Sequence, residues 1–173
     1  MVRCALFASL MAVCAWISIP IPPVSFTMQT FGVFLAYLIL GTRGGAASVL
    51  LYVMLGIVGL PAFSGGGGGI GAVIGPTGGF IAGWLLMAPL FGLSKRYAKG
   101  GRAIPVMCAA SALLIMYVCG TLWYAFYIGR LDLAGVLSAA AVSVLPFIVP
   151  DVIKLLLAVT VSRRLSEIIK KHF

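Results

Sequence analysis

An acid and a base stand three residues apart within an apolar stretch near the end of the chain. Asp151 and Lys154 lie in the run from Pro146 to Leu157, and residues i and i+3 of a helix share one face. Only three residues of the chain are acidic, and a charge inside a membrane is costly and usually tolerated only for function. The pair therefore predicts the polar floor of a substrate pocket. The alternative is an internal salt bridge that only ties helices together.

The composition excludes a soluble globular domain. Of the 173 residues, 62% are hydrophobic and 9% are charged, whereas globular domains carry about 25% charged residues. This leaves too little polar surface to cover a water-facing exterior. We therefore expect an all-α integral membrane protein in which residues 1–173 form a single membrane domain. The apolar start resembles a signal peptide, but no convincing cleavage site follows it, so we expect it to remain as the first span.

The apolar segments predict six transmembrane helices. A full span needs about 20 apolar residues, and three of these segments are nearer 15, so their boundaries are approximate. Pro146 and Pro150 interrupt the last segment, and proline is favoured at the first position of a helix. We expect a new helix near Pro150 with Asp151 in its first turn, where an acid complements the helix dipole. The segments are 5–19, 27–40, 46–60, 70–93, 103–127 and 133–162.

The distribution of basic residues supports this count. With a cytoplasmic N-terminus, ten basic residues fall on the inner side, Arg130 falls outside, and Lys154 lies within the membrane. The net charge of +9 then reflects membrane topology, together with attraction of the inner basic residues to anionic lipid. It does not indicate nucleic-acid binding. The ten inner residues are Arg3, Arg43, Lys95, Arg96, Lys99, Arg102, Arg163, Arg164, Lys170 and Lys171.

Two loops on the predicted outer side are unusually apolar. Residues 19–30 carry no charge and contain three prolines, and residues 60–80 contain five consecutive glycines, Gly65 to Gly69. Non-helical backbone at membrane depth persists only where protein covers it or water reaches it. We therefore expect both loops to be ordered and to cover the outer mouth of a cavity. For the second loop, the alternative is a flexible linker.

A glycine-rich segment, Gly75, Thr77, Gly78 and Gly79, opens the fourth span. Free N–H groups at a helix N-terminus suit an anionic or carbonyl-bearing ligand. Close packing of helices through glycine is the alternative. No lysine follows the glycines as it does in a nucleotide-binding loop, so we do not expect nucleotide binding.

Small and aromatic residues indicate helix faces. Alanines at positions 5, 8, 12 and 15 form a shallow strip on the first span, which either packs inside the chain or lets a partner helix approach closely. Among the aromatic residues with a polar edge, Trp84 and Tyr117 are candidates for an internal wall. Trp123, Tyr124 and Tyr127 are expected in an interfacial belt.

The sequence gives little support for catalysis. The single histidine, His172, lies in the C-terminal tail, so a Ser–His dyad within the membrane is not expected. Histidine, cysteine and acidic residues are too few and too far apart for a metal site. We therefore expect neither an enzyme nor a bound metal or cofactor.

Three segments taken together, 19–30, 65–79 and 150–158, resemble the BioY family, the biotin-specific S components of energy-coupling factor (ECF) transporters. The resemblance extends in order over essentially the whole chain. It implies six helices and a biotin pocket closed on the outer side by the loops after helices 1 and 3. It also implies that Asp151 and Lys154 contact the ligand. Further ligand contacts are expected from the Gly75–Gly79 segment, and gating from Pro22, Phe26, Gln29, Gly66 and Gly68.

The same resemblance implies that an Ala-x-x-x-Ala face, matched by Ala8 and Ala12, docks on a transmembrane coupling subunit that works with two ATPases. The expected protein is a high-affinity biotin-binding subunit in a prokaryotic cell membrane, with cytoplasmic termini, the lipid bilayer as its surroundings, and no cofactor. Two other classes remain open. One is a small secondary carrier or channel that uses Asp151 and Lys154 for proton or ion coupling, and the other is a scaffold subunit without a ligand.

Overall fold

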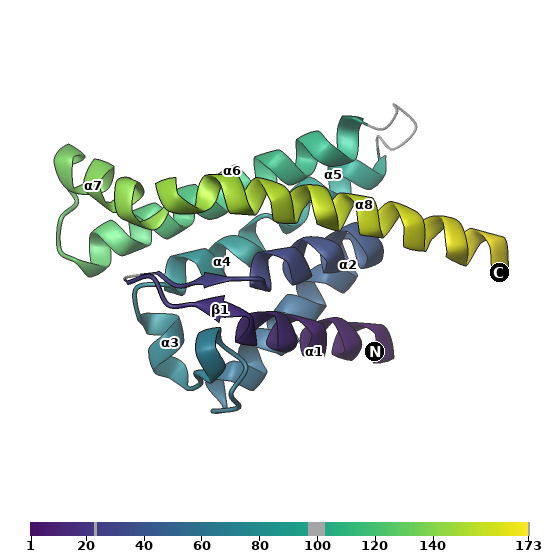
Figure 1. Ribbon diagram of the computed structural model, residues 1–173, viewed down its shortest axis with the longest axis horizontal. Coiled ribbons are helices and arrows are strands. Elements are labelled where there is room, and N and C mark those ends of the chain that lie inside the picture. The colour runs from purple at the N-terminus through teal and green to yellow at the C-terminus, as the bar shows by residue number, and fades with distance from the viewer. Residues whose placement is uncertain (23, 97–102, 173) are drawn as a thin grey trace.

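A computed structural model describes residues 1–22, 24–96 and 103–172 of the chain. It is a bundle of helices with one short β-hairpin (Figure 1). The predicted all-α membrane fold is confirmed, although residues 18–27 add a two-stranded sheet. The elements are α1 (Val2–Trp16), β1 (Ser18–Ile19), β2 (Phe26–Thr27), α2 (Gln29–Ile57), η1 (Ser64–Gly66), α3 (Ile70–Ile74), α4 (Gly78–Leu86), α5 (Ala88–Arg96), α6 (Ala103–Tyr127), α7 (Leu133–Ser143), η3 (Leu145–Phe147) and α8 (Ile148–His172).

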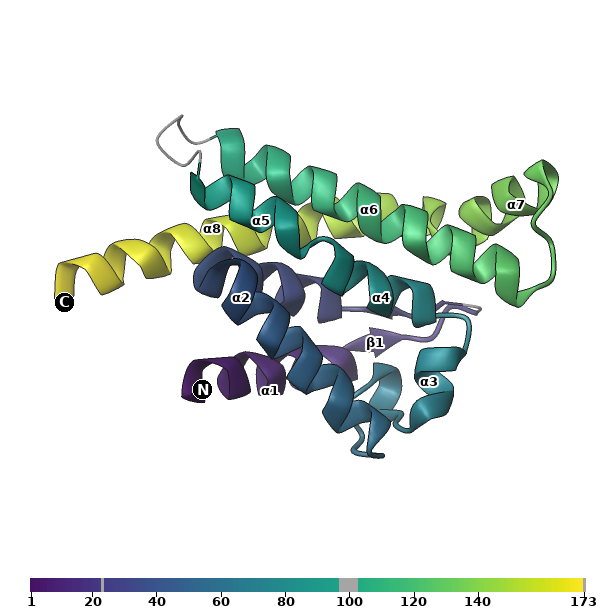
Figure 2. The same cartoon turned by 180° about the vertical axis from the view of Figure 1, so that it is seen from behind.

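Helix α2 consists of two helices joined by a sharp reversal. Gly41 has φ 75° and ψ −169°, a conformation that glycine adopts at little cost. A β-carbon built on Gly45 would lie 2.9 Å from the Cα of Tyr37, whereas eight residues of straight helix span about 12 Å. The chain therefore turns back on itself, as the two views in Figures 1 and 2 show. Residues 29–40 and 42–57 correspond to the second and third predicted spans.

Six membrane helices follow from this reversal. Three helical stretches are long and apolar enough to cross a membrane, namely Gln29–Ile57, Ile104–Tyr127 and Leu133–Leu165, and two shorter apolar ones are Val2–Trp16 and Gly78–Leu93. Because the first stretch folds back at Gly41, the described part of the chain supplies the six helices that were predicted. The apolar side chains that α6 and α8 expose are suited to lipid, and they include Leu114, Val118, Leu122, Ile153 and Leu156.

The last predicted span divides into α7 and α8. Asp132 caps α7 by accepting a hydrogen bond from the backbone N–H of Gly135. The short 3-10 turn η3, with a proline in its first positions, separates the two helices. Helix α8 begins at Ile148, two residues before Pro150, and Asp151 lies in its first turn as predicted. The outer part of this segment is therefore a separate short helix.

Both outer loops are ordered. The first forms the hairpin in which Ser18 pairs with Thr27 and Ile19 with Phe26; Pro23 lies outside the described residues. In the second loop, the backbone N–H of Phe63 donates to the carbonyl oxygen of Gly67 over 2.8 Å. Gly65, Gly66 and Gly69 adopt positive φ. The glycine run is thus a defined turn, which contradicts the flexible-linker alternative.

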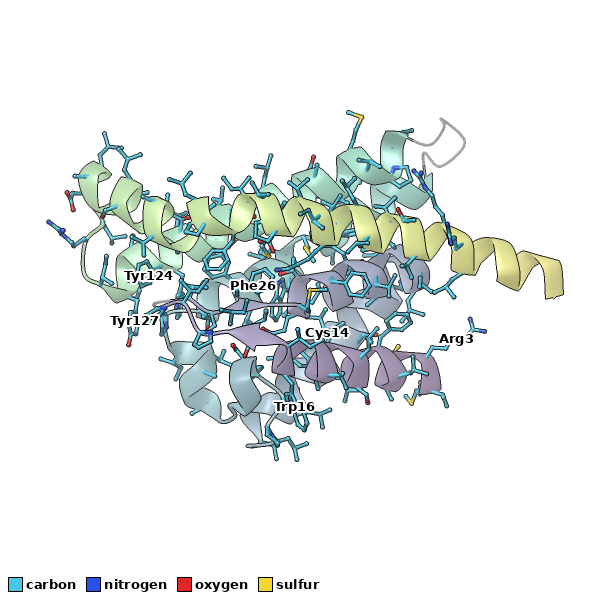
Figure 3. The ribbon with its side chains drawn as sticks, in the orientation of Figure 1. Arg3, Cys14, Trp16, Phe26, Tyr124 and Tyr127 are labelled. Atoms are coloured by element: carbon cyan, nitrogen blue, oxygen red, sulfur yellow. The ribbon has the colours of Figure 1, made fainter. Side chains whose placement is uncertain are left out.

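The two ends of the bundle differ in the segments that they carry. The N- and C-termini and the reversal of α2 lie at one end, and the α6–α7 connection and α3 lie at the other (Figure 1). Arg3 extends from the first end, while Tyr124 and Tyr127 lie toward the second (Figure 3). Lys99 and Arg102 fall outside the described residues. Arg130 belongs to the α6–α7 connection, so it lies apart from Arg3.

Helix α1 packs against α2 through its small residues. Ala8 is 1% exposed and Ala15 is fully buried, whereas Ala12 is half-buried and Ala5 is exposed. Internal packing therefore describes Ala8. The docking role predicted for Ala8 and Ala12 stays a prediction, and Ala8 offers a partner less exposed surface than Ala12.

The packing of α1 generates the first test. Ala8→Trp forces a large ring into a filled interface, and overpacking of this kind costs about 1–3 kcal/mol. We expect a lower melting temperature for Ala8→Trp in detergent, and an unchanged one for Ala5→Trp, because Ala5 faces outward. Equal melting temperatures for the two variants would show that Ala8 is not packed against α2.

Candidate ligand-binding pocket

A cavity with a volume of about 250 Å³ lies within the bundle. Both outer loops, α4, α6, the α7–α8 turn and the first turns of α8 contribute to its walls. Its composition is mixed, with charged, hydroxyl, amide and aromatic side chains. The lining residues are Val24, Ser25, Thr27, Gln29, Thr30, Phe63, Ser64, Gly67, Ala72, Thr77, Phe80, Ile81, Trp84, Met116, Tyr117, Ser143, Phe147, Asp151 and Lys154.

Asp151 and Lys154 form an ion pair in this cavity. The ammonium nitrogen Nζ of Lys154 lies 2.7 Å from Oδ1 of Asp151, and the two residues are 3% and 4% exposed, respectively. The i and i+3 spacing on α8 brings both side chains to one face, as predicted. Both side chains line the cavity, so the pair lies where a ligand in the cavity could reach it. Their contact with a ligand stays a prediction.

Two aromatic residues complete the surroundings of the pair. The hydroxyl of Tyr117, from α6, donates to Oδ2 of Asp151 over 2.9 Å, so each carboxylate oxygen has a partner. Nζ of Lys154 lies 3.9 Å from the ring centroid of Phe26 in β2, where the face of an aromatic ring attracts a cation. Phe26 points into the bundle from the hairpin (Figure 3). The pair is therefore held between α6, α8 and the first outer loop.

Lys154 keeps the capacity to donate to a ligand. An ammonium group carries three N–H donors. Within residues 1–22, 24–96 and 103–172, the hydrogen bond from Lys154 goes to Asp151 alone. An acceptor such as a carbonyl or carboxylate oxygen in the cavity would therefore find an available, buried cation.

Aromatic side chains form part of the cavity wall. Trp84 and Tyr117, the two residues predicted for an internal wall, both line the cavity and are 5% and 8% exposed. The indole N–H of Trp123 donates to the carbonyl oxygen of Gly75 over 2.9 Å, and its place in an interfacial belt stays a prediction. This hydrogen bond fixes the start of α4 against α6.

The glycine-rich segment divides between two roles. Thr77 lines the cavity, and its hydroxyl donates to the carbonyl oxygen of Ala72. Gly78 and Gly79 are buried against α6: a β-carbon on Gly79 would overlap Trp123 and lie 2.5 Å from the carbonyl oxygen of Cys119. Close helix packing, the alternative considered from the sequence, describes these two glycines. Of the four residues predicted here, only Thr77 is among the described lining residues, and ligand contact by Gly75, Gly78 and Gly79 stays a prediction.

The predicted gating residues also occupy different positions. Gln29 and Phe26 lie at the inner side of the first loop, where Gln29 lines the cavity and Phe26 contacts Lys154. Pro22 is exposed, as are Gly66 and Gly68. Between these two glycines, Gly67 lines the cavity. The glycine run thus reaches the cavity at one residue that the sequence pattern did not distinguish from its neighbours.

Several lining residues were not predicted from the sequence. Ser143 and Phe147 come from the end of α7 and from η3, which the hydropathy pattern does not separate from lipid-facing residues. Thr27 and Thr30 flank the start of α2, and their hydroxyls were the available signal, because buried polar groups need partners. Tyr117 was predicted as a wall residue, but its hydrogen bond to Asp151 was not.

The sequence and the fold have counterparts among known proteins. The BioY family model matches residues 1–171. The chain belongs to the BioY family. The probable biotin transporter BioY of Pyrococcus horikoshii is 39% identical over 162 residues, which cover 94% of this chain and 93% of that protein. The biotin transporter BioY of Thermotoga maritima is 36% identical over 168 residues, covering 97% and 96% of the two chains.

A solved structure agrees with this assignment. The chain is similar to the S-component for biotin from an ECF-type ABC transporter, with a TM-score of 0.84 and 28% identity. The alignment covers 96% of this chain and 89% of the solved chain. The fold of this chain is therefore that of the solved S-component.

The position of Gly79 generates the second test. Gly79→Ala introduces a β-carbon against the backbone of α6, and we expect it to destabilise the ligand-free protein by about 1–3 kcal/mol. Gly71→Ala is the matched control, because a β-carbon there meets nothing within 4 Å. Thermal unfolding in detergent measures both. If Gly79→Ala kept the wild-type melting temperature but lost ligand affinity, Gly79 would be a ligand contact rather than a packing residue.

Proposed function

We propose that this chain is the biotin-binding, substrate-specificity subunit of an ECF-type transporter. The observation that carries the proposal is the buried Asp151–Lys154 pair, which lines a cavity bounded by both outer loops. The names of the relatives and of the similar solved structure support biotin as the ligand. The chain would supply recognition, and its partners would supply the energy for uptake.

The chemistry of biotin matches the lining. Biotin has a ureido group that both donates and accepts hydrogen bonds, an apolar bicycle and chain, and a carboxylate. The carboxylate of Asp151 accepts, the ammonium of Lys154 donates, and the aromatic wall around Trp84 suits the apolar parts. Small-molecule sites commonly combine an apolar lining with a few well-placed polar groups. Either polar end of biotin has a complementary group in this cavity.

The function test uses the purified chain in detergent. Isothermal titration should give nanomolar affinity or tighter, a binding free energy of about −12 kcal/mol or beyond. Lys154→Ala and Asp151→Ala should each lose roughly 2–5 kcal/mol of binding, because each leaves the other charge buried and unpaired. Arg130→Ala removes an exposed charge in the α6–α7 connection and should bind like the wild type.

Other outcomes would point to the rival functions. Absence of binding heat and of retained labelled biotin at micromolar ligand would contradict biotin binding and favour a carrier of another kind or a scaffold. Wild-type affinity in both pair variants would leave biotin binding intact but make the pair structural.

Assembly with a coupling subunit and two ATPases forms the second part of the proposal. The sequence contains no nucleotide-binding loop, so uptake against a gradient would depend on ATPases elsewhere. By the positive-inside rule, the end of the bundle with both termini would face the cytoplasm of a prokaryotic cell. The two outer loops would then cover the cavity on the opposite side of the membrane.

The docking helix would be α1, through residues that the chain itself leaves uncovered. Ala5 and Ser9 are exposed at i and i+4 on this helix, a spacing that lets another helix approach closely. We propose this pair, with the half-buried Ala12 beside it, as the contact in place of Ala8.

The docking proposal has its own test. Ala5→Trp combined with Ser9→Trp should bind biotin normally, because α1 contributes none of the described lining residues. It should fail to co-purify with a coupling subunit and fail to support ATP-driven uptake. The control is Leu114→Trp combined with Val118→Trp on the exposed face of α6, which should assemble and transport. Normal uptake by the α1 variant would move the docking surface to another helix.

A further inference from the structure

Tyr52 lies between the two outer loops and contacts both. It belongs to the second half of α2 and is fully buried. Its ring packs edge-on against Phe63 of the second loop, with centroids 5.7 Å apart and planes at 88°. Tyr52 is not among the described residues that line the cavity, so the proposed function gives it no contact with ligand.

Its hydroxyl belongs to a directed chain of hydrogen bonds. The Thr27 hydroxyl donates to Oε1 of Gln29 over 2.8 Å, and Nε2 of Gln29 donates to the Tyr52 hydroxyl. The Tyr52 hydroxyl in turn donates to the carbonyl oxygen of Ala62 over 2.7 Å. Each hydroxyl or amide group accepts one bond and donates the next, an arrangement in which the bonds strengthen one another. The chain begins in the hairpin and ends in the second loop.

The hairpin end of this chain is close to the ion pair. Thr27 follows Phe26 in β2, and the ring of Phe26 faces the ammonium of Lys154 at 3.9 Å. Gln29 and Phe63 both line the cavity. A ligand in the cavity would therefore lie against residues of both loops. Tyr52 contacts Gln29 of one loop and Phe63 of the other.

The second loop has another contact, with the end of α1, which is more exposed to solvent. The indole N–H of Trp16 donates to the carbonyl oxygen of Pro61 over 2.7 Å, but Trp16 is 63% exposed. Water can replace the hydrogen-bond partner of an exposed group, whereas a buried donor or acceptor that loses its partner stays unsatisfied. Without the Tyr52 hydroxyl, the Gln29 amide and the Ala62 carbonyl oxygen would each lose a buried partner.

We propose that Tyr52 is a positioning residue that joins the two outer loops into one cover, so that they open together. The proposal rests on the proposed function only in taking the cavity as the ligand site. Its physical content is that the hydroxyl of Tyr52 couples the hairpin to the glycine turn. Opening either loop alone would break one of the two buried hydrogen bonds of the Tyr52 hydroxyl, and the bond that remained would lose the strengthening that neighbouring bonds in such a chain give one another.

The kinetic test uses Tyr52→Phe, which keeps the ring and its contact with Phe63. We expect biotin to dissociate roughly ten-fold faster, because two buried hydrogen bonds are lost, with little change in the association rate. Tyr37→Phe is the matched control: Tyr37 lies in the other half of α2, is 1% exposed, and donates to the carbonyl oxygen of Trp84 over 2.7 Å rather than to a loop. Its dissociation rate should stay close to that of the wild type. Equal dissociation rates for wild type and Tyr52→Phe would overturn the proposal.

Hydrogen exchange of the ligand-free protein tests the coupling independently of the ligand. The reporters are the backbone amide of Met28, bonded to Ile17 in the first loop, and those of Phe63 and Gly69 in the second. In Tyr52→Phe, all three should exchange faster, and in Tyr37→Phe they should not. Faster exchange in one loop only, or in neither, would overturn the proposal. If the wild type bound no biotin, the proposed function would fail, and the exchange result would still decide the role of Tyr52.

Discussion

Two opposite charges, with their nearest atoms 2.7 Å apart, lie almost inaccessible inside a bundle whose exterior is apolar. Removing both from water is costly, and their attraction offsets that cost only when the remaining polar atoms also find partners. Tyr117 serves the second carboxylate oxygen, and the ring of Phe26 faces the ammonium. α6 and the first outer loop must therefore meet α8 at this level of the bundle. The cavity is bounded by the segments that meet there.

The remaining architecture keeps the charges away from bulk water with little polar material. The reversal at Gly41 folds one long apolar segment into two helices, and Gly78 and Gly79 bring α4 close to α6. Above the cavity, the chain forms a hairpin and a glycine turn instead of helix. Backbone groups of each loop bond within that loop, and the N–H of Gly69 donates to the carbonyl oxygen of Gly56 in α2. Irregular backbone near a membrane needs partners for its polar groups, and these hydrogen bonds supply part of them. The hydrogen-bond chain through Tyr52 connects the two loops.

The sequence predicted the features that depend on local pattern. Hydropathy located the six helices, and Pro146 and Pro150 indicated the break before the helix that carries Asp151. The side on which Ala8 lies was harder to predict, because lipid is as apolar as a protein core and hydropathy does not separate the two faces of such a helix. The partners of Asp151 and Tyr52 are distant in sequence, and their pairing depends on the whole fold. The hairpin was not predicted, since the prolines of residues 19–30 favoured an irregular loop.

The central claim is that the cavity between the Asp151–Lys154 pair and the two outer loops is the ligand site. A crystal structure of the chain grown with biotin tests it most directly. We expect density for one biotin molecule between the ion pair and the wall that contains Trp84, with a polar group of the ligand within hydrogen-bonding distance of Lys154. Density for biotin at another place, with this cavity empty and the pair unchanged, would contradict the claim.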